Sequence, residues 1–243
     1  MIAGRVRLDY PHDPRMRVCA ETLYTWISLP SQRWRGLTHY LPLGHKTRRT
    51  RAGRRVHRHT MKYRIPIHSR PPEIDERSEF GHWEIDSIIG NNHSGAIHTA
   101  TERTSRYIAA RLLPDTSAKA TLDAEKDWIS QLPIHAVRSL TADNGHEFAY
   151  HYQLADTTAI PTYFADPYSA WQRGTNERFN REIRRYLPKG TRFNTLTTSE
   201  LDDIITEINN KPRKCLHWHT PAETLHHQIQ SNQTPTVALQ TRT

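Results

Sequence analysis

The chain has 243 residues, 35% of them hydrophobic, and a formal net charge of +9, which allows one domain of ordinary size with an appendage. No stretch reaches the roughly 18 to 20 consecutive apolar residues of a membrane helix, and the N-terminal MIAGRVRL lacks the apolar segment of a signal peptide. Its two cysteines, Cys19 and Cys215, exclude a disulfide framework, so the sequence predicts a cytoplasmic protein with no membrane partner.

Two short helices are predicted near the N-terminus. Apolar residues recur at every fourth position from Ile2 to Tyr10, and Pro11 would end this first helix. A second apolar face around Trp26 indicates another helix after a turn. We therefore assign residues 1–29 to a partial helix-turn-helix DNA-binding segment.

A basic linker is predicted at residues 30–72. Residues 1–72 hold 16 lysines and arginines against three acids, a net charge of +13, whereas residues 73–243 hold 18 against 22, a net charge of −4. Charge of one sign over this length predicts a polyanionic partner, although a solvated basic tail without a specific target is the alternative. The candidate DNA-binding residues of the linker are Arg48, Arg49, Arg51, Arg54, Arg55 and Arg58.

The remaining chain alternates between strand and helix patterns. Strands are predicted at 82–90, 96–105, 106–114, 136–143 and 160–166. Helices are predicted at about 118–131 after Ser117, 146–157, 176–187 and 199–210, the last with a capping box of Ser199 and Asp202. This order predicts an α/β fold in which an antiparallel meander joins a parallel part in a mixed five-stranded sheet, with helices on both faces. We place this domain at 73–228 and a polar tail at 229–243.

Three acidic residues stand out by position. Asp86 lies inside a predicted strand, where aspartate is locally unfavourable, Asp143 ends another strand, and Glu177 opens a helix after a long loop. Taken singly, Asp143 could be a turn residue and Glu177 a partner of Arg181. Taken together at one edge of a sheet, such carboxylates repel one another, and a divalent cation relieves that repulsion. Two magnesium ions about 3.5–4 Å apart are a known device for cutting phosphodiesters.

The segments around these acids resemble a known family. GHWEIDSIIG, TERTSRY, TADNGHEFA, YFADPYSAWQRGTNERFNREIRRYLPKGT and INNKPRKCLHWHTPAETL are similar, in that order, to the catalytic domain of bacterial transposases of the insertion-sequence-thirty family. These belong to the DDE transposase and retroviral integrase superfamily, so the resemblance implies an RNase H-like fold. The family's three acids match Asp86, Asp143 and Glu177, and the 33 residues between the last two are the family's spacing.

The resemblance also implies an activity. The three acids would be both the catalytic residues and the ligands of two Mg²⁺ or Mn²⁺ ions. Water would hydrolyse a phosphodiester at the end of a mobile element, and the freed 3′-OH would attack a second phosphodiester without a covalent protein–DNA intermediate. The implied partners are double-stranded DNA, as terminal repeats and target, and further copies of the chain in a homo-oligomer on DNA at the nucleoid.

Several residues near Glu177 are candidates for DNA contact. They are Trp171, Gln172 and Arg173 in the preceding loop and Arg178, Arg181, Arg184 and Arg185 on the helix. The alternative for the helix arginines is a solvated basic face. Cys215 and the histidines near it do not have the paired spacing of a structural zinc site, so no zinc is predicted.

The resemblance is incomplete at the N-terminus. Family members are longer there, and residues 1–29 resemble only the later part of their helix-turn-helix region. We therefore expect an N-terminally truncated chain. This leaves two alternatives to an active transposase: a non-catalytic, DNA-binding remnant, and a simple RNase H-type nuclease, which would not explain the basic arm or the WQRGTNE motif.

Overall fold

A computed structural model describes residues 2–35, 37, 61–167 and 169–233. The chain divides into two compact units, one of Met1–His59 with Pro212–His219 and the other of Thr60–Lys211 with Thr220–Thr243. No helix in the described ranges is both long and apolar enough to cross a membrane.

The first unit contains the two predicted N-terminal helices, α1 (Ile2–Asp9) and α2 (Ala20–Ser28). The sulfur of Cys19 accepts a hydrogen bond from the backbone N–H of Thr22 at 3.3 Å, which caps α2. Single 3₁₀ turns complete the unit: η1 (Pro14–Met16), η2 (Pro30–Arg35) and η10 (Lys214–Leu216). None of the buried hydrophobic residues of the described chain belongs to this unit, so its helices enclose no core of their own there.

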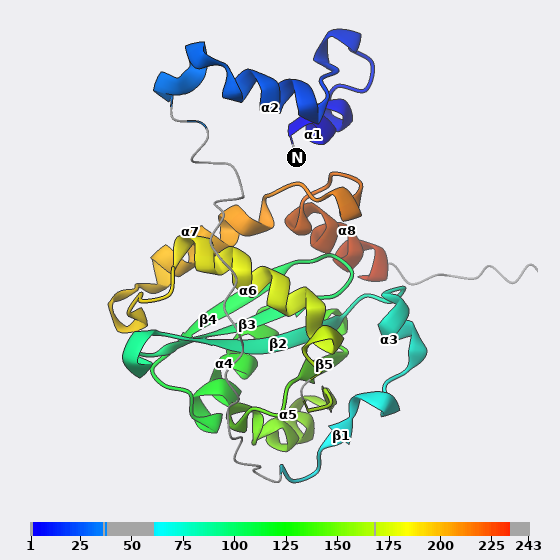
Figure 1. The fold of residues 1–243 in the computed structure, drawn as a ribbon. Helices are drawn as coiled ribbons and strands as arrows, with labels where there is room; N and C mark the ends of the chain where they lie inside the picture. Colours follow the sequence, from blue (N-terminus) through cyan, green and yellow to red (C-terminus); the bar gives the residue numbers. More distant parts are fainter. Residues whose placement is uncertain (1, 36, 38–60, 168, 234–243) are drawn as a thin grey trace, which may run out of the picture. The chain divides into compact units, whose positions relative to one another are not determined.

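The second unit is built on one mixed sheet (Figure 1). Its strands are β1 (Ile65–Pro66), β2 (His82–Ile89), β3 (Ala96–Glu102), β4 (Ile108–Leu113), β5 (Ser139–Ala142) and β6 (Thr162–Phe164), in the order β1-β6-β5-β2-β3-β4. The meander of β2, β3 and β4 is antiparallel, as predicted, and β2, β5, β6 and β1 are parallel. The sheet has six strands and not five, because the two residues of β1, inside the expected linker, pair with the end of β6.

Helices cover both faces of this sheet (Figure 1). On one face α4 (Ala118–Ser130) and α5 (His151–Thr158) enclose a core in which the rings of Trp83 and Trp128 lie 4.9 Å apart. On the other, α6 (Gly174–Tyr186) and α7 (Thr198–Asn209) enclose a core that includes Phe179. Side chains alternate along a strand, so when Trp83 of β2 faces α4, Asp86 faces α6.

The predicted helices differ from the observed ones mainly at their ends. Ser117 caps α4 as expected, its hydroxyl accepting from the N–H of Ala120 at 3.2 Å. The expected capping box of Ser199 and Asp202 is wrong, because Thr197 and Glu200 form it and α7 begins earlier. The helix expected at 146–157 is divided into the turn η7 (His146–Phe148) and α5.

Two further helices belong to the second unit. α3 (Pro72–Glu76) precedes the sheet, and α8 (Pro221–Gln233) extends into the expected polar tail. Two apolar residues are enough to dock α8, since Leu225 is buried in the first core and Ile229 packs against it. The rest of the tail, 234–243, lies outside the described residues. The remaining 3₁₀ turns are η4 (Ile67–Ser69), η5 (Asn91–His93), η6 (Ile134–Ala136), η8 (Ala170–Arg173) and η9 (Phe193–Thr195).

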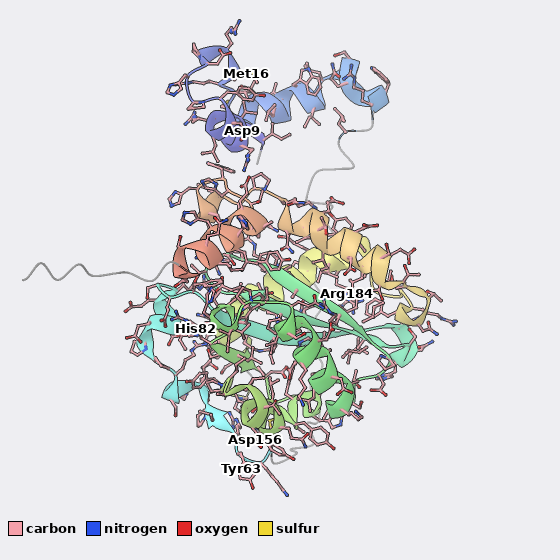
Figure 2. The ribbon with its side chains drawn as sticks, turned by 180° about the vertical axis from the view of Figure 1, so that it is seen from behind. Asp9, Met16, Tyr63, His82, Asp156 and Arg184 are labelled. Atoms are coloured by element: carbon pink, nitrogen blue, oxygen red, sulfur yellow. The ribbon has the colours of Figure 1, made fainter. Side chains whose placement is uncertain are left out.

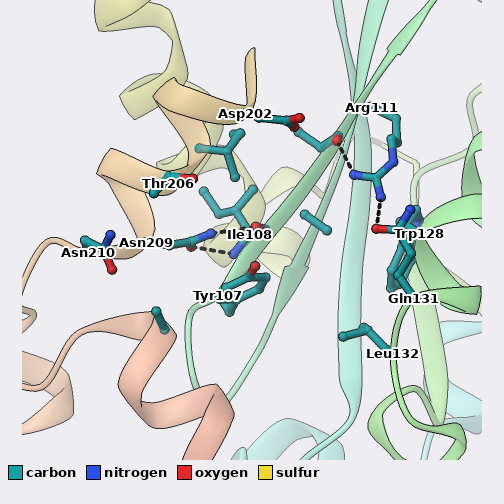
Figure 3. Close-up of a pocket in the computed structure, with 14 residues that line it drawn as sticks. Tyr107, Ile108, Arg111, Trp128, Gln131, Leu132, Asp202, Thr206, Asn209 and Asn210 are labelled. Carbon is teal, nitrogen blue, oxygen red and sulfur yellow. Dashed lines mark hydrogen bonds between the residues drawn. The ribbon is translucent and has the colours of Figure 1, made fainter. Parts of the chain in front are cut away.

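The free edge of the sheet, at β4, is covered by a side chain of α7 (Figure 3). Asn209 is buried, donates a hydrogen bond of 2.8 Å to the carbonyl of Ile108 and accepts one of 2.9 Å from its N–H. The amide of Asn209 therefore replaces one residue of a neighbouring strand. Beside it lies a cavity of about 370 Å³ between β4, α4 and α7, where Arg111 donates to Gln131 at 2.5 Å.

Candidate active site

Asp86 lies within β2, and Asp143 directly follows β5, the parallel strand next to it. Glu84 of β2 is paired with Thr141 of β5, and each aspartate follows two residues later in its own chain segment. Residues two apart in a strand share a face, so both carboxylates lie on the α6 side of the sheet. The structure therefore brings together two of the three acids that the sequence singled out.

The guanidinium of Arg173 joins the two carboxylates. Its Nη2 donates to Oδ2 of Asp143 at 3.0 Å, and its Nη1 lies 3.5 Å from Oδ1 of Asp86. Nη1 also donates to the carbonyl of Ile85 at 3.1 Å, and the side chain is only 13% exposed. Arg173 was expected to contact DNA, but in this structure its charge is directed at the acids.

The two aspartates and Glu147 form an electrostatically coupled group. Burial raises the pKa of Asp86, Arg173 opposes that rise, and the charge of Asp143 adds to it. Burial also raises the pKa of Glu147, and the charges of Asp143 and Asp86 raise it further. Burial and like-charged neighbours disfavour the ionised form of a carboxyl group, and a nearby cation stabilises that form. Arg173 is the cation that does so here.

α6 runs alongside β2, as the hydrogen bonds between them show. Asn176 donates from its side chain to the carbonyl of Glu84 at 3.1 Å, and Asn180 donates to Oδ2 of Asp86 at 2.8 Å. Arg184 (Figure 2) donates to the carbonyl of Ile89 at 2.7 Å. Four residues of a helix rise about 6 Å, which is close to the length of two residues of a strand. Asn176 and Asn180 can therefore contact Glu84 and Asp86 in turn.

Glu177, the third predicted acid, lies in the first turn of α6. Its side chain is 62% exposed, and its Oε1 lies 3.5 Å from Nη2 of Arg181. It follows Arg173 by four residues and precedes Asn180 by three, and both of those reach Asp86. Glu177 therefore belongs to the stripe of the helix that faces the aspartates. No hydrogen bond or ion pair joins it to either aspartate within the described chain.

The donor chemistry of the site suits a hard divalent cation in part. Carboxylate oxygens, as at Asp86 and Asp143, are the ligands that Mg²⁺ and Mn²⁺ prefer, and Arg173 shows that this position accepts a cation. Over the described ranges, no three histidine, cysteine, aspartate or glutamate side chains converge closely enough to hold one metal ion. The aspartate pair thus fits a metal, whereas Glu177 as observed does not reach it.

A buried ion pair, not among the predicted site residues, anchors α6 to the sheet. Glu84 has no exposed surface and accepts from Nη1 of Arg103 at 2.5 Å and from the backbone N–H of Asn176 at 2.9 Å. Arg103 is also buried. The sequence signal was a glutamate two residues before Asp86, but nothing in the sequence identified its partners.

The other candidates for DNA contact differ in how exposed their side chains are. Gln172 is held by Asp166, donating to its carboxylate at 2.9 Å and accepting from its N–H at 2.8 Å. Arg184 is half-buried, its guanidinium 5.5 Å from the ring of Phe193. The exposed candidates are Trp171, Arg178, Arg181 and Arg185. The linker candidates Arg48, Arg49, Arg51, Arg54, Arg55 and Arg58 lie outside the described residues.

Comparison with curated sequences identifies several transposases. No family model matches the chain. The transposase for insertion sequence element IS1086 of Cupriavidus metallidurans is 35% identical over 241 residues, covering 98% of this chain and 71% of the relative. The transposase InsI for IS30C of Escherichia coli is 37% identical over 231 residues, covering 91% and 59%. The transposase for IS4351 of Bacteroides fragilis is 36% identical over 233 residues, covering 95% and 69%.

Comparison with solved structures shows the fold. The catalytic core domain of BIV integrase matches with a TM-score of 0.50 at 21% identity, and the match covers 64% of this chain and all of that domain. At this identity the likeness concerns the fold alone. The predicted RNase H-like, integrase-core arrangement is thereby confirmed.

Proposed function

The chain belongs to the IS30 family of transposases, and from this membership we propose that it cuts and joins DNA at the ends of an insertion sequence by a two-metal DDE mechanism. The observation that carries the proposal is the pair of aspartates, Asp86 in β2 and Asp143 directly after the adjacent parallel strand β5, with one cationic group between them. Such a pair is suited to hold positive charge against a phosphodiester.

Asp86, Asp143 and Glu177 would hold two Mg²⁺ or Mn²⁺ ions. When bound, such ions activate the attacking oxygen and stabilise the leaving oxygen of a phosphodiester. For the carboxylates to take part, Arg173 has to release them, and Glu177 has to leave Arg181, which its exposed position on α6 permits. Asn180 would keep Asp86 oriented throughout through its 2.8 Å hydrogen bond.

The proposed reaction has two balanced steps. In the first, a water oxygen bonds to phosphorus, the bond from phosphorus to the 3′ oxygen breaks, and a 3′-OH and a 5′-phosphate result. In the second, that 3′ oxygen attacks a target phosphodiester, forms a new bond to phosphorus and releases a target 3′-OH. The protein contributes positioning and charge, so no serine or tyrosine nucleophile is required.

The proposed DNA contacts form two separate sets, one on the exposed side of α6 and one from the arginines of the basic linker. Arg178, Arg181 and Arg185 are exposed along α6 beside the acids, and each phosphate they neutralise would release a counterion. Paired element ends require more than one catalytic site, so we propose a homo-oligomer on DNA, located at the nucleoid. The chain spans only 59% to 71% of the length of the three transposases compared above. The cleavage activity of the 243-residue chain itself is therefore what has to be measured.

The test is a strand-cleavage assay with the full 243-residue chain. A supercoiled plasmid carrying the element's terminal repeats would be incubated with Mg²⁺ or Mn²⁺ and either the parent or one of the variants Asp86→Asn, Asp143→Asn and Glu177→Gln. Asp156→Asn is the matched control, because Asp156 is exposed on α5 (Figure 2), which covers the opposite face of the sheet. We expect nicking and joining by the parent and the control and none by the three variants.

Other outcomes would select the alternatives. DNA retardation that weakens steeply with salt, without metal-dependent cleavage, would identify a non-catalytic DNA-binding remnant. Cleavage without strand transfer would identify a simple nuclease of the same fold. Cleavage that persists in any of the three variants would remove that residue from the proposed triad.

A further inference from the structure

A second polar cavity lies next to the acidic site. It measures about 340 Å³ and is lined mainly by polar groups from the segments around Arg70, Arg77, Arg103 and Gly174. Since Arg173, which binds the catalytic aspartates, directly precedes Gly174, the cavity and the acidic site share the start of α6. We propose that this cavity binds a backbone phosphate of the DNA strand that is cut, an inference that rests on the proposed function.

Two of the three arginines are fixed in place before any ligand arrives. Arg103 is buried against Glu84 at 2.5 Å, and Arg70 is buried, donates to the hydroxyl of Thr141 at 3.1 Å and pairs with Asp75. The Nε of Arg70 is buried without a hydrogen-bond partner among the described residues. A buried N–H donor without an acceptor costs free energy, so the residues around Arg70 leave its guanidinium incompletely satisfied.

The third arginine supplies charge that is not neutralised. Arg77 is exposed and donates to the hydroxyl of Thr175 at 3.2 Å, and no carboxylate of the described chain lies within ion-pair distance of it. Asp75 and Glu84 balance only two of the three guanidinium groups. The pKa of Arg103 is lowered, first by burial and also by the positive charges of Arg70 and Arg77. An anion in the cavity would relieve this repulsion.

The start of α6 adds to the attraction for an anion. Its N-cap residue, Arg173, provides no side-chain cap, and the positive end of the helix dipole is compensated in part by Glu84 at the N–H of Asn176 and by Glu177 in the first turn. The space beside Gly174 is open, because a Cβ added there would meet no atom within 4 Å. The backbone can therefore be approached closely by a phosphate, as at other helix N-termini.

The position of the cavity relative to the aspartates indicates which phosphate it holds. Arg103 and Arg70 contact Glu84 and Thr141, which precede Asp86 and Asp143 by two residues on the same sheet face. Two strand residues span about 7 Å, comparable with one step along a DNA strand. The phosphate would thus be the neighbour of the one that is cut. Trp171, which also lines the cavity and is 75% exposed, offers its ring for stacking against the adjoining base.

The test compares Arg77→Gln with Arg192→Gln in the full chain. Both arginines are exposed, but Arg192 follows the far end of α6, whose 13 residues span about 20 Å. Inorganic phosphate would be titrated while the Nε–H signals of Arg70 and Arg103 are followed by ¹⁵N NMR. We expect saturable shifts in the parent and in Arg192→Gln, and at least a several-fold weaker response in Arg77→Gln.

A second arm measures binding to a duplex carrying the element's end. The slope of log Kobs against log salt should fall by about 0.9 in Arg77→Gln, the value for one lost phosphate contact, and remain unchanged in Arg192→Gln. Absent phosphate shifts, or an unchanged slope with Arg77→Gln, would overturn the cavity proposal even if cleavage is intact. Normal phosphate shifts without any metal-dependent cleavage would instead support the cavity and refute the catalytic function.

Discussion

The side-chain amide of Asn180 donates a hydrogen bond of 2.8 Å to Oδ2 of Asp86, and its carbonyl oxygen accepts one of 3.0 Å from the hydroxyl of Thr99. Asn180 thereby joins α6 to β2 and β3 at the proposed metal ligand. Removing this support should loosen Asp86 without unfolding the domain, since Asn180 is only half-buried.

We therefore expect Asn180→Ala to raise the metal concentration that DNA cleavage requires. Loss of a group that orients a metal ligand typically costs 10- to 100-fold in metal affinity or activity. The measurement is the Mn²⁺ concentration that gives half-maximal cleavage, with Asn232→Ala, exposed on α8, as the control. An unchanged half-maximal concentration would show that Asp86 holds its orientation without Asn180.

Arg173→Gln tests the cation between the aspartates. Arg173 opposes the rise in the pKa of Asp86, so its removal should raise that pKa further. Asp86 would be followed by ¹³C NMR during a pH titration without metal. We also expect Mn²⁺ to raise Tm more in the variant than in the parent, because the metal no longer competes with the guanidinium. A pKa that stays or falls would contradict this role.

Asn209→Ala tests the protected edge of the sheet. The variant leaves the buried N–H and carbonyl of Ile108 without partners, and each such group costs about 1–3 kcal/mol. Urea denaturation should show a loss of at least about 2 kcal/mol in the free energy of unfolding. Asn210→Ala, the exposed neighbouring position, should change it by less than about 0.5 kcal/mol; equal effects would refute a specific clamp.

Glu125 should make the domain less stable in base. It is buried in α4, and burial raises its pKa from 4.5 to about 8. Because the folded state holds this proton more tightly than the unfolded state, the stability that Glu125 contributes is fully present below about pH 4.5 and is lost as the pH rises toward 8. Glu125→Gln should abolish that fall, which urea denaturation at pH 5 and pH 9 (about these values) would measure. A parent and variant that lose stability equally would contradict the assignment.

His98 should act in the opposite pH direction. Both of its ring nitrogens are buried without partners among the described residues, and burial lowers its pKa from 6.5 to about 3. The unfolded state then binds the proton first, so the stability present above pH 6.5 is lost as the pH falls toward 3. His98→Leu should be less sensitive to acid over that interval. An identical acid transition, measured by circular dichroism, would exclude His98 as its cause.

Some of the site could be predicted from the sequence because it depends on order along the chain. Asp86 and Asp143 fall in or next to segments whose strand character is local, and the parallel pairing of Glu84 with Thr141 places the two aspartates beside each other. The sequence predicted Arg173 as a DNA contact because an arginine in a loop is ordinarily solvated and free to meet a phosphate. Only the packing of α6 against β2 places it between two carboxylates.

The sequence by itself determined the fold class, the family resemblance, the candidate acids and most of the elements, since these follow from periodicity and from motifs that are contiguous in the chain. It did not predict β1, α3 or α8. The tertiary structure alone decided the partners: Arg103 for Glu84, Asn209 for Ile108, and the three arginines of the second cavity. Asn209 and Ile108, for example, are 101 residues apart. Hydrogen bonds and ion pairs act over a few ångströms, so which distant residues form them is fixed only when the sheet and helices pack.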